Sequence, residues 1–146
     1  MTVHLKKPRI LIVDDNCVIR NVIKSFFNEY DVELIMAVNG QEAVEMARAC
    51  TPDLIMLDIQ MPVLNGYEAA ALLKNDESVK AIPILVITGQ EYGQIAERLN
   101  GMYDGFVSKP FKKAALINAT IHYLPGTINK NANTKKRLCN QTIKTL

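Results

Sequence analysis

Residues 54–62, LIMLDIQMP, decide the fold expected for this chain. Four apolar residues run directly into one aspartate, Asp58, and apolar residues resume after it. A short apolar run without alternation is typical of a parallel strand that is covered on both faces. Because a carboxylate is costly to bury without a partner, we expect Asp58 to lie at the end of this strand, beside groups that stabilise its charge.

Two further segments share this character, ILIV at 10–13 and ILVI at 84–87, and two weaker candidates complete a set of five strands. The predicted strands are residues 9–13, 33–37, 54–57, 84–87 and 106–108. Apolar residues recur at helical spacing between them. This spacing predicts helices at 18–27 (with Asn16 as N-cap), 41–49, 67–74, 92–99 and 112–124.

Strands that alternate with helices predict an α/β fold with a parallel sheet and right-handed crossovers. The pattern alone does not give the strand order. A five-stranded parallel sheet of flavodoxin-like order 2-1-3-4-5 with five flanking helices is the best small-domain candidate. This order would place a ligand crevice between the first and third strands, at their carboxyl ends.

Composition bounds the class of protein. The chain has 146 residues, 49% of them hydrophobic and 22% charged, which is typical of one globular domain. No segment approaches the roughly 20 apolar residues of a membrane span, so we expect a cytoplasmic protein without membrane insertion. The three cysteines form no Cys-x-x-Cys pair and are expected to be reduced thiols, with Cys17 as a small packing residue.

Charge is distributed unevenly along the chain. Residues 1–124 form the predicted domain and contain 12 basic and 15 acidic residues. Residues 125–146 contain five basic residues and no acidic one, and they are expected to form a flexible basic tail. The tail has no interleaved aromatic residues and no recognition-helix pattern, so a nucleic-acid partner is disfavoured.

Polar residues follow the predicted strands at positions that a parallel sheet brings to one rim. Asp14 and Asp15 follow the first strand, Asp58 the third, Thr88 the fourth and Lys109 the fifth. Three carboxylates beside one ammonium raise each other's pKa unless a cation lies among them. A few carboxylates with room for water and phosphate oxygens favour Mg²⁺ over Ca²⁺.

This set of groups predicts phosphoryl chemistry. With a divalent cation to neutralise phosphoryl oxygens, Asp58 could attack phosphorus and form an acyl phosphate. Lys109 would then pair with one phosphoryl oxygen, and the hydroxyl of Thr88 would donate a hydrogen bond to another.

Asp14-Asp15, Asp58, Thr88 and Lys109-Pro110 resemble the signature set of the receiver domain of two-component response regulators. The resemblance covers about residues 9–124. The flanking segments are especially similar to those of receivers in hybrid sensor histidine kinases: VDDN, NGQEAVE, PDLIMLDIQMP and NGYEA. The occurrence of these motifs in order at consistent spacing makes the resemblance specific.

The resemblance implies that Asp58 accepts a phosphoryl group from a phosphohistidine on a histidine kinase or a histidine phosphotransfer protein. It also implies that Mg²⁺ is held by Asp15, Asp58 and the backbone carbonyl of Gln60, with Asp14 helping through water. The resemblance implies a phosphoacceptor signalling domain that assists its own phosphorylation and dephosphorylation, and not an enzyme.

The resemblance further implies a conformational switch. Lys109-Pro110 resembles the cis peptide of the family, and Phe106 matches its switch aromatic. After phosphorylation, Thr88 would move toward the phosphoryl group and Phe106 would enter the vacated space. This movement would reshape the face made by the fourth helix, fifth strand and fifth helix.

The sequence departs from the family pattern near the phosphoryl site. Gly89 follows Thr88 where the family often has alanine, so the site should be more open. Gln60 and Gln90 lie near the approach of water in the family, and neutral amides cannot act as general bases. We therefore expect an acyl phosphate of intermediate lifetime.

Two other functions are weighed against a receiver. Phosphohydrolases of the haloacid dehalogenase type also use a strand-end aspartate, but their second aspartate, two residues later, is replaced here by Gln60. A phosphorylation-independent adaptor has no need of an acidic metal site. The sequence does not distinguish a stand-alone regulator from a fragment of a hybrid kinase, nor does it name the kinase or the target.

Overall fold

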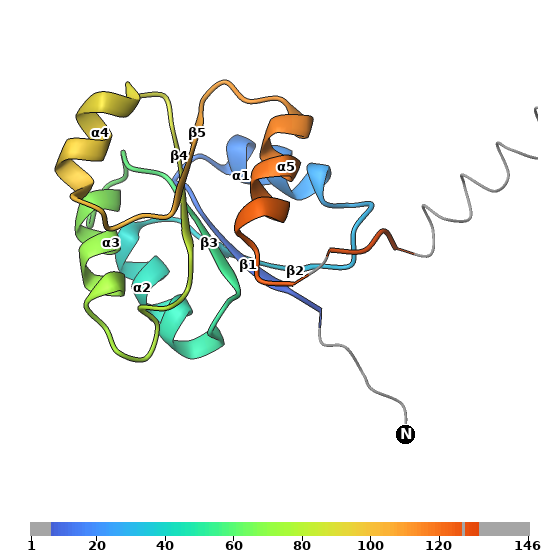
Figure 1. The fold of residues 1–146 in the computed structure, drawn as a ribbon, viewed down its shortest axis with the longest axis horizontal. Coiled ribbons are helices and arrows are strands. Elements are labelled where there is room, and N and C mark those ends of the chain that lie inside the picture. Colours follow the sequence, from blue (N-terminus) through green and yellow to red (C-terminus); the bar gives the residue numbers. More distant parts are fainter. Residues whose placement is uncertain (1–6, 127, 132–146) are drawn as a thin grey trace, which may run out of the picture.

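The computed structural model describes residues 7–126 and 128–131 as one layered domain (Figure 1). The elements in chain order are β1 Arg9–Val13, α1 Cys17–Phe26, β2 Glu33–Ala37, α2 Gly40–Cys50, β3 Leu54–Leu57, α3 Gly66–Lys74, β4 Ile84–Thr88, α4 Tyr92–Leu99, β5 Gly105–Ser108 and α5 Lys113–Tyr123. All strand pairs are parallel, and the sheet order is β2-β1-β3-β4-β5. The predicted fold class and strand order are confirmed.

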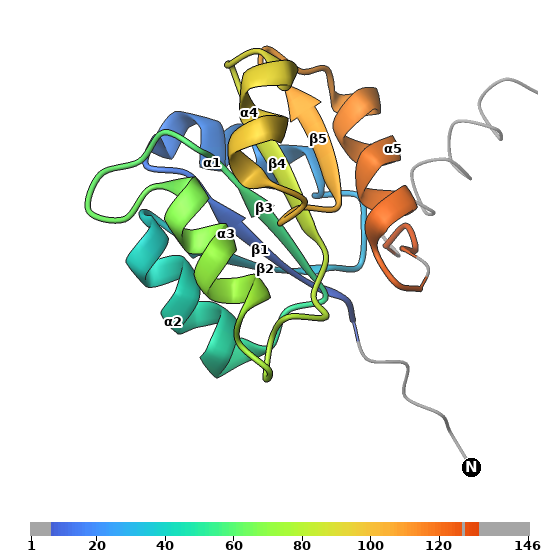
Figure 2. The same ribbon diagram turned by 60° about the vertical axis from the view of Figure 1, so that its left-hand side comes forward.

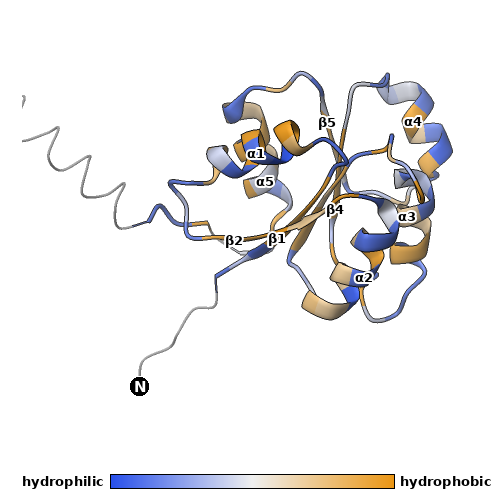
Figure 3. Cartoon of the chain, turned by 180° about the vertical axis from the view of Figure 1, so that it is seen from behind, coloured by the Kyte–Doolittle hydropathy of each residue, from blue (hydrophilic) through white to orange (hydrophobic). Residues whose placement is uncertain are grey.

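The sheet separates two hydrophobic cores. Helices α1 and α5 cover one face, and α2, α3 and α4 cover the other (Figures 1 and 2). Alternate residues of one strand serve the two sides: Ile10 and Ile12 belong to the core under α1 and α5, whereas Leu11 and Val13 belong to the other. The central strands are therefore apolar throughout, as their colouring in Figure 3 shows.

Asparagine caps fix where three helices begin. Asn16, Asn39 and Asn65 precede α1, α2 and α3, and each side-chain oxygen accepts a backbone N–H of the first turn at 2.8–3.0 Å. Such caps satisfy N–H groups that have no partner within the helix. The predicted cap at Asn16 is confirmed, and all three caps lie at the carboxyl ends of the preceding strands.

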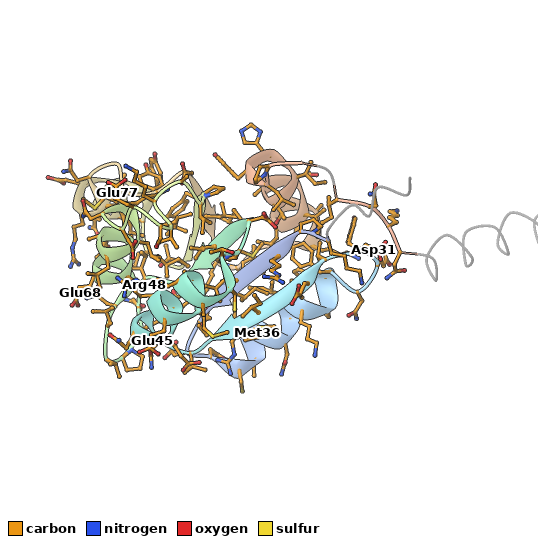
Figure 4. All side chains as sticks on the ribbon, turned by 90° about the horizontal axis from the view of Figure 1, so that it is seen from below. Asp31, Met36, Glu45, Arg48, Glu68 and Glu77 are labelled. Atoms are coloured by element: carbon orange, nitrogen blue, oxygen red, sulfur yellow. The ribbon has the colours of Figure 1, made fainter. Side chains whose placement is uncertain are left out.

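The described helices face solvent with charged residues. Seen from below, the labelled side chains of Glu45, Arg48, Glu68 and Glu77 lie at the periphery of α2, α3 and the α3–β4 loop (Figure 4). Arg48 also forms an ion pair of 2.6 Å with Asp76.

None of the helices in the described part of the chain has both the length and the apolarity that a membrane crossing requires.

The chain after α5 returns to the body near the start of β2. The Asp31 N–H donates to the carbonyl of Asn129, and the Asn131 N–H donates to the carbonyl of Glu29, both at 2.7 Å. These bonds flank an antiparallel bridge between Tyr30 and Lys130. Backbone pairing thus extends to residue 131. The basic run at 135–137 lies outside the described residues, so a flexible tail there stays a prediction.

Gly66 packs the start of α3 against the end of β3. Its N–H donates to the carbonyl of Ile59 at 2.9 Å. A Cβ at this position would overlap the carbonyl oxygen of Asp58 and the Cα of Ile59. The absence of a side chain therefore lets the β3–α3 loop close tightly around the backbone of Asp58.

Replacing Gly66 by alanine should therefore lower the free energy of unfolding by about 1–3 kcal/mol, because backbone atoms must shift to admit the methyl group. Gly93→Ala is the matched control, since Gly93 lies in exposed α4 with nothing within 4 Å of an added Cβ. That variant should gain about 0.5–1 kcal/mol from helix propensity. Urea unfolding measures both changes, and equal effects of the two substitutions would contradict this packing account.

Candidate functional site

The three predicted carboxylates meet at the carboxyl end of the sheet. Asp14 follows β1 and Asp58 follows β3, and these strands are neighbours. Each of Asp14, Asp15 and Asp58 offers an oxygen, and the three oxygens lie within 4.8 Å of one another. Asp14 and Asp58 are only 3% and 6% exposed, whereas Asp15 is open to solvent. The cluster is thus buried on one side and accessible on the other.

Lys109 lies between the two buried carboxylates. Its Nζ donates to Asp14 Oδ2 at 2.8 Å and lies 3.6 Å from Asp58 Oδ1. The lysine follows β5, and its backbone N–H donates to the carbonyl of Thr88 at 2.8 Å. The peptide bond between Lys109 and Pro110 is cis. The ammonium therefore lies next to both acids, and its shorter contact is to Asp14.

Asp14 has the closer contact with Lys109 of the two buried acids. In addition to the ion pair with Lys109, its Oδ1 accepts the backbone N–H of Asn16 at 2.9 Å. Asp58 has the longer contact to the ammonium, at 3.6 Å. Lys109 therefore neutralises the carboxylate of Asp14 at closer range than that of Asp58.

The environment opposes the charge of Asp58. Burial, and then the negative charge of Asp14, raise the pKa of Asp58 from 3.8 to about 6. Lys109 and backbone hydrogen bonds from Gln60 and Ile59 lower this pKa but do not offset the rise. A cation near the cluster would favour the ionised carboxylate, which is the form that acts as a nucleophile.

The donor set fits a hard divalent cation. Three carboxylate oxygens lie within 4.8 Å of one another, and exposed Asp15 leaves one side open to water. Mg²⁺ prefers such a combination of a few carboxylates with several waters. Gln60 lines the pocket beside Asp15, where its backbone carbonyl is predicted to complete the set.

Thr88 and Phe106 occupy the neighbouring strands. Thr88 is the last residue of β4, one position beyond the predicted end of that strand, and is 1% exposed. Its Oγ1 accepts the backbone N–H of Gln90 at 3.3 Å. Phe106 in β5 is half-buried, and its ring meets Tyr92 edge-on with centroids 5.1 Å apart. Both residues lie on the side of the sheet where the proposed switch would operate.

A pocket of about 350 Å³ adjoins the acid cluster. Its lining includes Asp15, Gln60, Tyr67, Gln90 and Arg98. Sequence reasoning found the two glutamines but missed Tyr67 and Arg98. Their places in α3 and α4 were predicted, but no local pattern indicates that two helical side chains reach the same pocket.

Cys17 differs from its prediction. We expected a small packing residue, but Cys17 is exposed at the first position of α1. The apolar side of α1 is carried by residues such as Ile23, which is 2% exposed. The prediction failed because residues that directly follow the acid pair belong to the open rim.

Comparison with known proteins decides the family. The family model of the response regulator receiver domain matches residues 10–121. The chain belongs to this family. It is therefore a receiver domain of two-component signalling systems, as its motifs predict, and receivers are signalling domains.

Individual relatives agree with this assignment. The receiver is 35% identical over 129 residues to the autoinducer 1 sensor kinase/phosphatase LuxN of Vibrio campbellii, covering 88% of this chain and 14% of that protein. It is 34% identical over 111 residues to the chemotaxis protein CheY of Halobacterium salinarum, covering 76% and 92% of the two chains. This chain thus spans a small part of the sensor kinase and nearly all of the chemotaxis protein.

Solved structures show the same fold. The receiver domain of the sensor histidine kinase PA1611 from Pseudomonas aeruginosa has a magnesium ion coordinated in its active site cleft. It matches this chain with a TM-score of 0.74 at 27% identity, over 81% of this chain and 98% of that one.

The raised pKa of Asp58 predicts a pH-dependent stability. Since the folded pKa is about 6 and the ordinary value is 3.8, ionisation of Asp58 opposes folding. The loss of folding stability caused by this ionisation is absent below pH 3.8. It grows between pH 3.8 and about pH 6 and is complete above about pH 6. Without divalent cations, Asp58→Asn should unfold with a free energy about 1–3 kcal/mol higher than wild type at about pH 7.5.

Urea unfolding in EDTA at about pH 7.5 and about pH 4 measures this difference. The gain should disappear at the lower pH, where Asp58 of the wild type is protonated. A gain of equal size at both pH values would show that packing, and not charge, causes it.

Proposed function

We propose that this receiver takes a phosphoryl group on Asp58 from a phosphohistidine of a histidine kinase or a histidine phosphotransfer protein. The observation that carries the proposal is the arrangement of Lys109 with two buried carboxylates, in which Asp14 has the shorter contact, 2.8 Å, and Asp58 the longer, 3.6 Å. Asp58 is thereby held at the rim beside an ammonium whose shorter contact is to Asp14.

The transfer is a displacement at phosphorus. A carboxylate oxygen of Asp58 forms a bond to phosphorus while the bond to the histidine nitrogen breaks, and the electron pair leaves with the imidazole. Lys109 stabilises the negative charge of the transferred group, and the hydroxyl of Thr88 donates a hydrogen bond to it. Asp14, Asp15, Asp58 and the backbone carbonyl of Gln60 would hold Mg²⁺, which supplies charge neutralisation at the phosphoryl oxygens.

The domain in this way assists its own phosphorylation and later dephosphorylation. The observed neighbours of Thr88 support a switch that follows. The backbone N–H of Lys109 donates to the carbonyl of Thr88, and Phe106 lies in β5, the strand that pairs with β4. Movement of Thr88 toward the phosphoryl group would let Phe106 turn inward and would reshape the surface of α4, β5 and α5.

The phosphorylated receiver would signal through protein contacts on this reshaped surface. We place the protein in the cytoplasm. The similarity to a sensor kinase and to a chemotaxis protein leaves two settings open, a receiver within a hybrid kinase and a stand-alone regulator. Nucleic acid is not among the proposed partners.

Incubation with acetyl phosphate and Mg²⁺, followed by intact mass spectrometry, tests the acceptor. Wild type should gain about 80 Da, one phosphoryl group, and Asp58→Ala should not. Asp31→Ala is the matched control, since Asp31 lies on the opposite rim, before β2, and this variant should be labelled like wild type. Equal labelling of the Asp58→Ala variant would refute the assignment, and no labelling of wild type would favour a phosphorylation-independent adaptor.

A further inference from the structure

Gln90 is held by a side chain from a distant part of the sequence. The Tyr67 hydroxyl donates to Gln90 Oε1 at 3.2 Å, across 23 positions of sequence. Tyr67 lies in the first turn of α3, and Gln90 lies in the loop between β4 and α4. Both side chains line the pocket that Asp15 and Gln60 share. The hydrogen bond therefore acts at the edge of the proposed phosphoryl site.

Arg98 holds Tyr67 in turn. The guanidinium carbon of Arg98 lies 3.8 Å from the centroid of the Tyr67 ring, within the range of a cation–π contact. Arg98 is on α4, which lies beside α3 (Figure 2). The contact places the phenol between the two helices and restricts its rotation. Arg98, Tyr67 and Gln90 thus form a connected row, here named the pocket wall.

The hydrogen bond determines which part of the Gln90 amide remains available. Because Oε1 accepts from Tyr67, one of its two lone pairs is occupied and the carbonyl end of the amide is held at Tyr67. Glutamine amides orient hydrolytic water in other phosphoryl-transfer sites. Orienting a water for attack requires an acceptor for one of its O–H groups, and here the Gln90 carbonyl that could accept is held toward Tyr67.

We propose that Tyr67 and Arg98 are positioning residues that keep the Gln90 carbonyl from orienting hydrolytic water, and so lengthen the life of the acyl phosphate. The proposal rests on the proposed function, in that it concerns the phosphoryl group on Asp58. It accounts for an intermediate lifetime through the pocket wall, in addition to the absence of a general base at Gln60 and Gln90.

The affected step is hydrolysis of the acyl phosphate. The oxygen of water forms a bond to phosphorus as the bond between phosphorus and the Asp58 carboxylate oxygen breaks. The electron pair stays with the Asp58 carboxylate, and the protons of water remain on the released phosphate or pass to solvent. Freeing Gln90 Oε1 would supply an acceptor that aligns the water for this attack.

The test compares decay rates of phosphorylated variants. Each protein is labelled with acetyl phosphate and Mg²⁺ and is then desalted into Mg²⁺ buffer, and the phosphorylated fraction is followed by intact mass. Tyr67→Phe keeps the ring and removes the hydroxyl, and it should decay about two- to ten-fold faster than wild type, the effect of one neutral hydrogen bond. Arg98→Met should accelerate decay by a smaller factor.

Controls separate positioning from damage. Tyr30→Phe, before β2 on the opposite rim, should decay like wild type. Tyr67→Phe/Gln90→Ala should decay no faster than Gln90→Ala, because the effect passes through Gln90. Faster decay of the phosphorylated protein is not the result expected if the substitution damages the site. Thermal unfolding checks that each variant is folded.

The outcomes also separate this inference from the proposed function. If wild type is not labelled on Asp58, the proposed function fails before any rates are compared. If wild type is labelled but Tyr67→Phe decays at an equal or slower rate, or decays faster even without Gln90, the role of the pocket wall is overturned and the acceptor assignment stands.

Discussion

The site depends on one electrostatic constraint, the crowding of three carboxylates at the rim of a parallel sheet, two of them beside one ammonium. Lys109 approaches Asp14 to 2.8 Å and Asp58 only to 3.6 Å, so the two buried acids are neutralised unequally. Burial and then the charge of Asp14, which Lys109 does not offset, raise the pKa of Asp58 to about 6. A cation among these carboxylates would favour the ionised form of Asp58.

The fold supplies this crowding through its topology. Because β1 and β3 are neighbours, the residues that follow them are brought together although 44 positions separate Asp14 from Asp58. The asparagine caps begin helices α1, α2 and α3 at this rim. Gly66 lets α3 begin close to the backbone of Asp58. Packing on the two faces of the sheet therefore positions the acids, and the loops leave them accessible.

The sequence predicted those parts of the structure that follow from strand periodicity and from motifs at strand ends. The apolar runs located the strands. The flavodoxin-like strand order could be predicted because few small parallel sheets are compatible with five strands that alternate with helices. The contact of Tyr67 with Gln90 was not predictable, since it depends on the packing of α3 against α4. The exposure of Cys17 and the pairing of Asn129 with Asp31 likewise depend on how the loops close. Tertiary contacts between side chains of different helices leave no periodic signal.

The most direct measurement of the central claim is the titration of the Asp58 carboxyl carbon by NMR, with and without Mg²⁺. The account predicts a pKa of about 6 without divalent cations, as burial and Asp14 require. Saturating Mg²⁺ should lower this pKa by at least about one unit, because a cation among the carboxylates favours the charged form. A titration near the ordinary value of 3.8 that Mg²⁺ leaves unchanged would contradict the account.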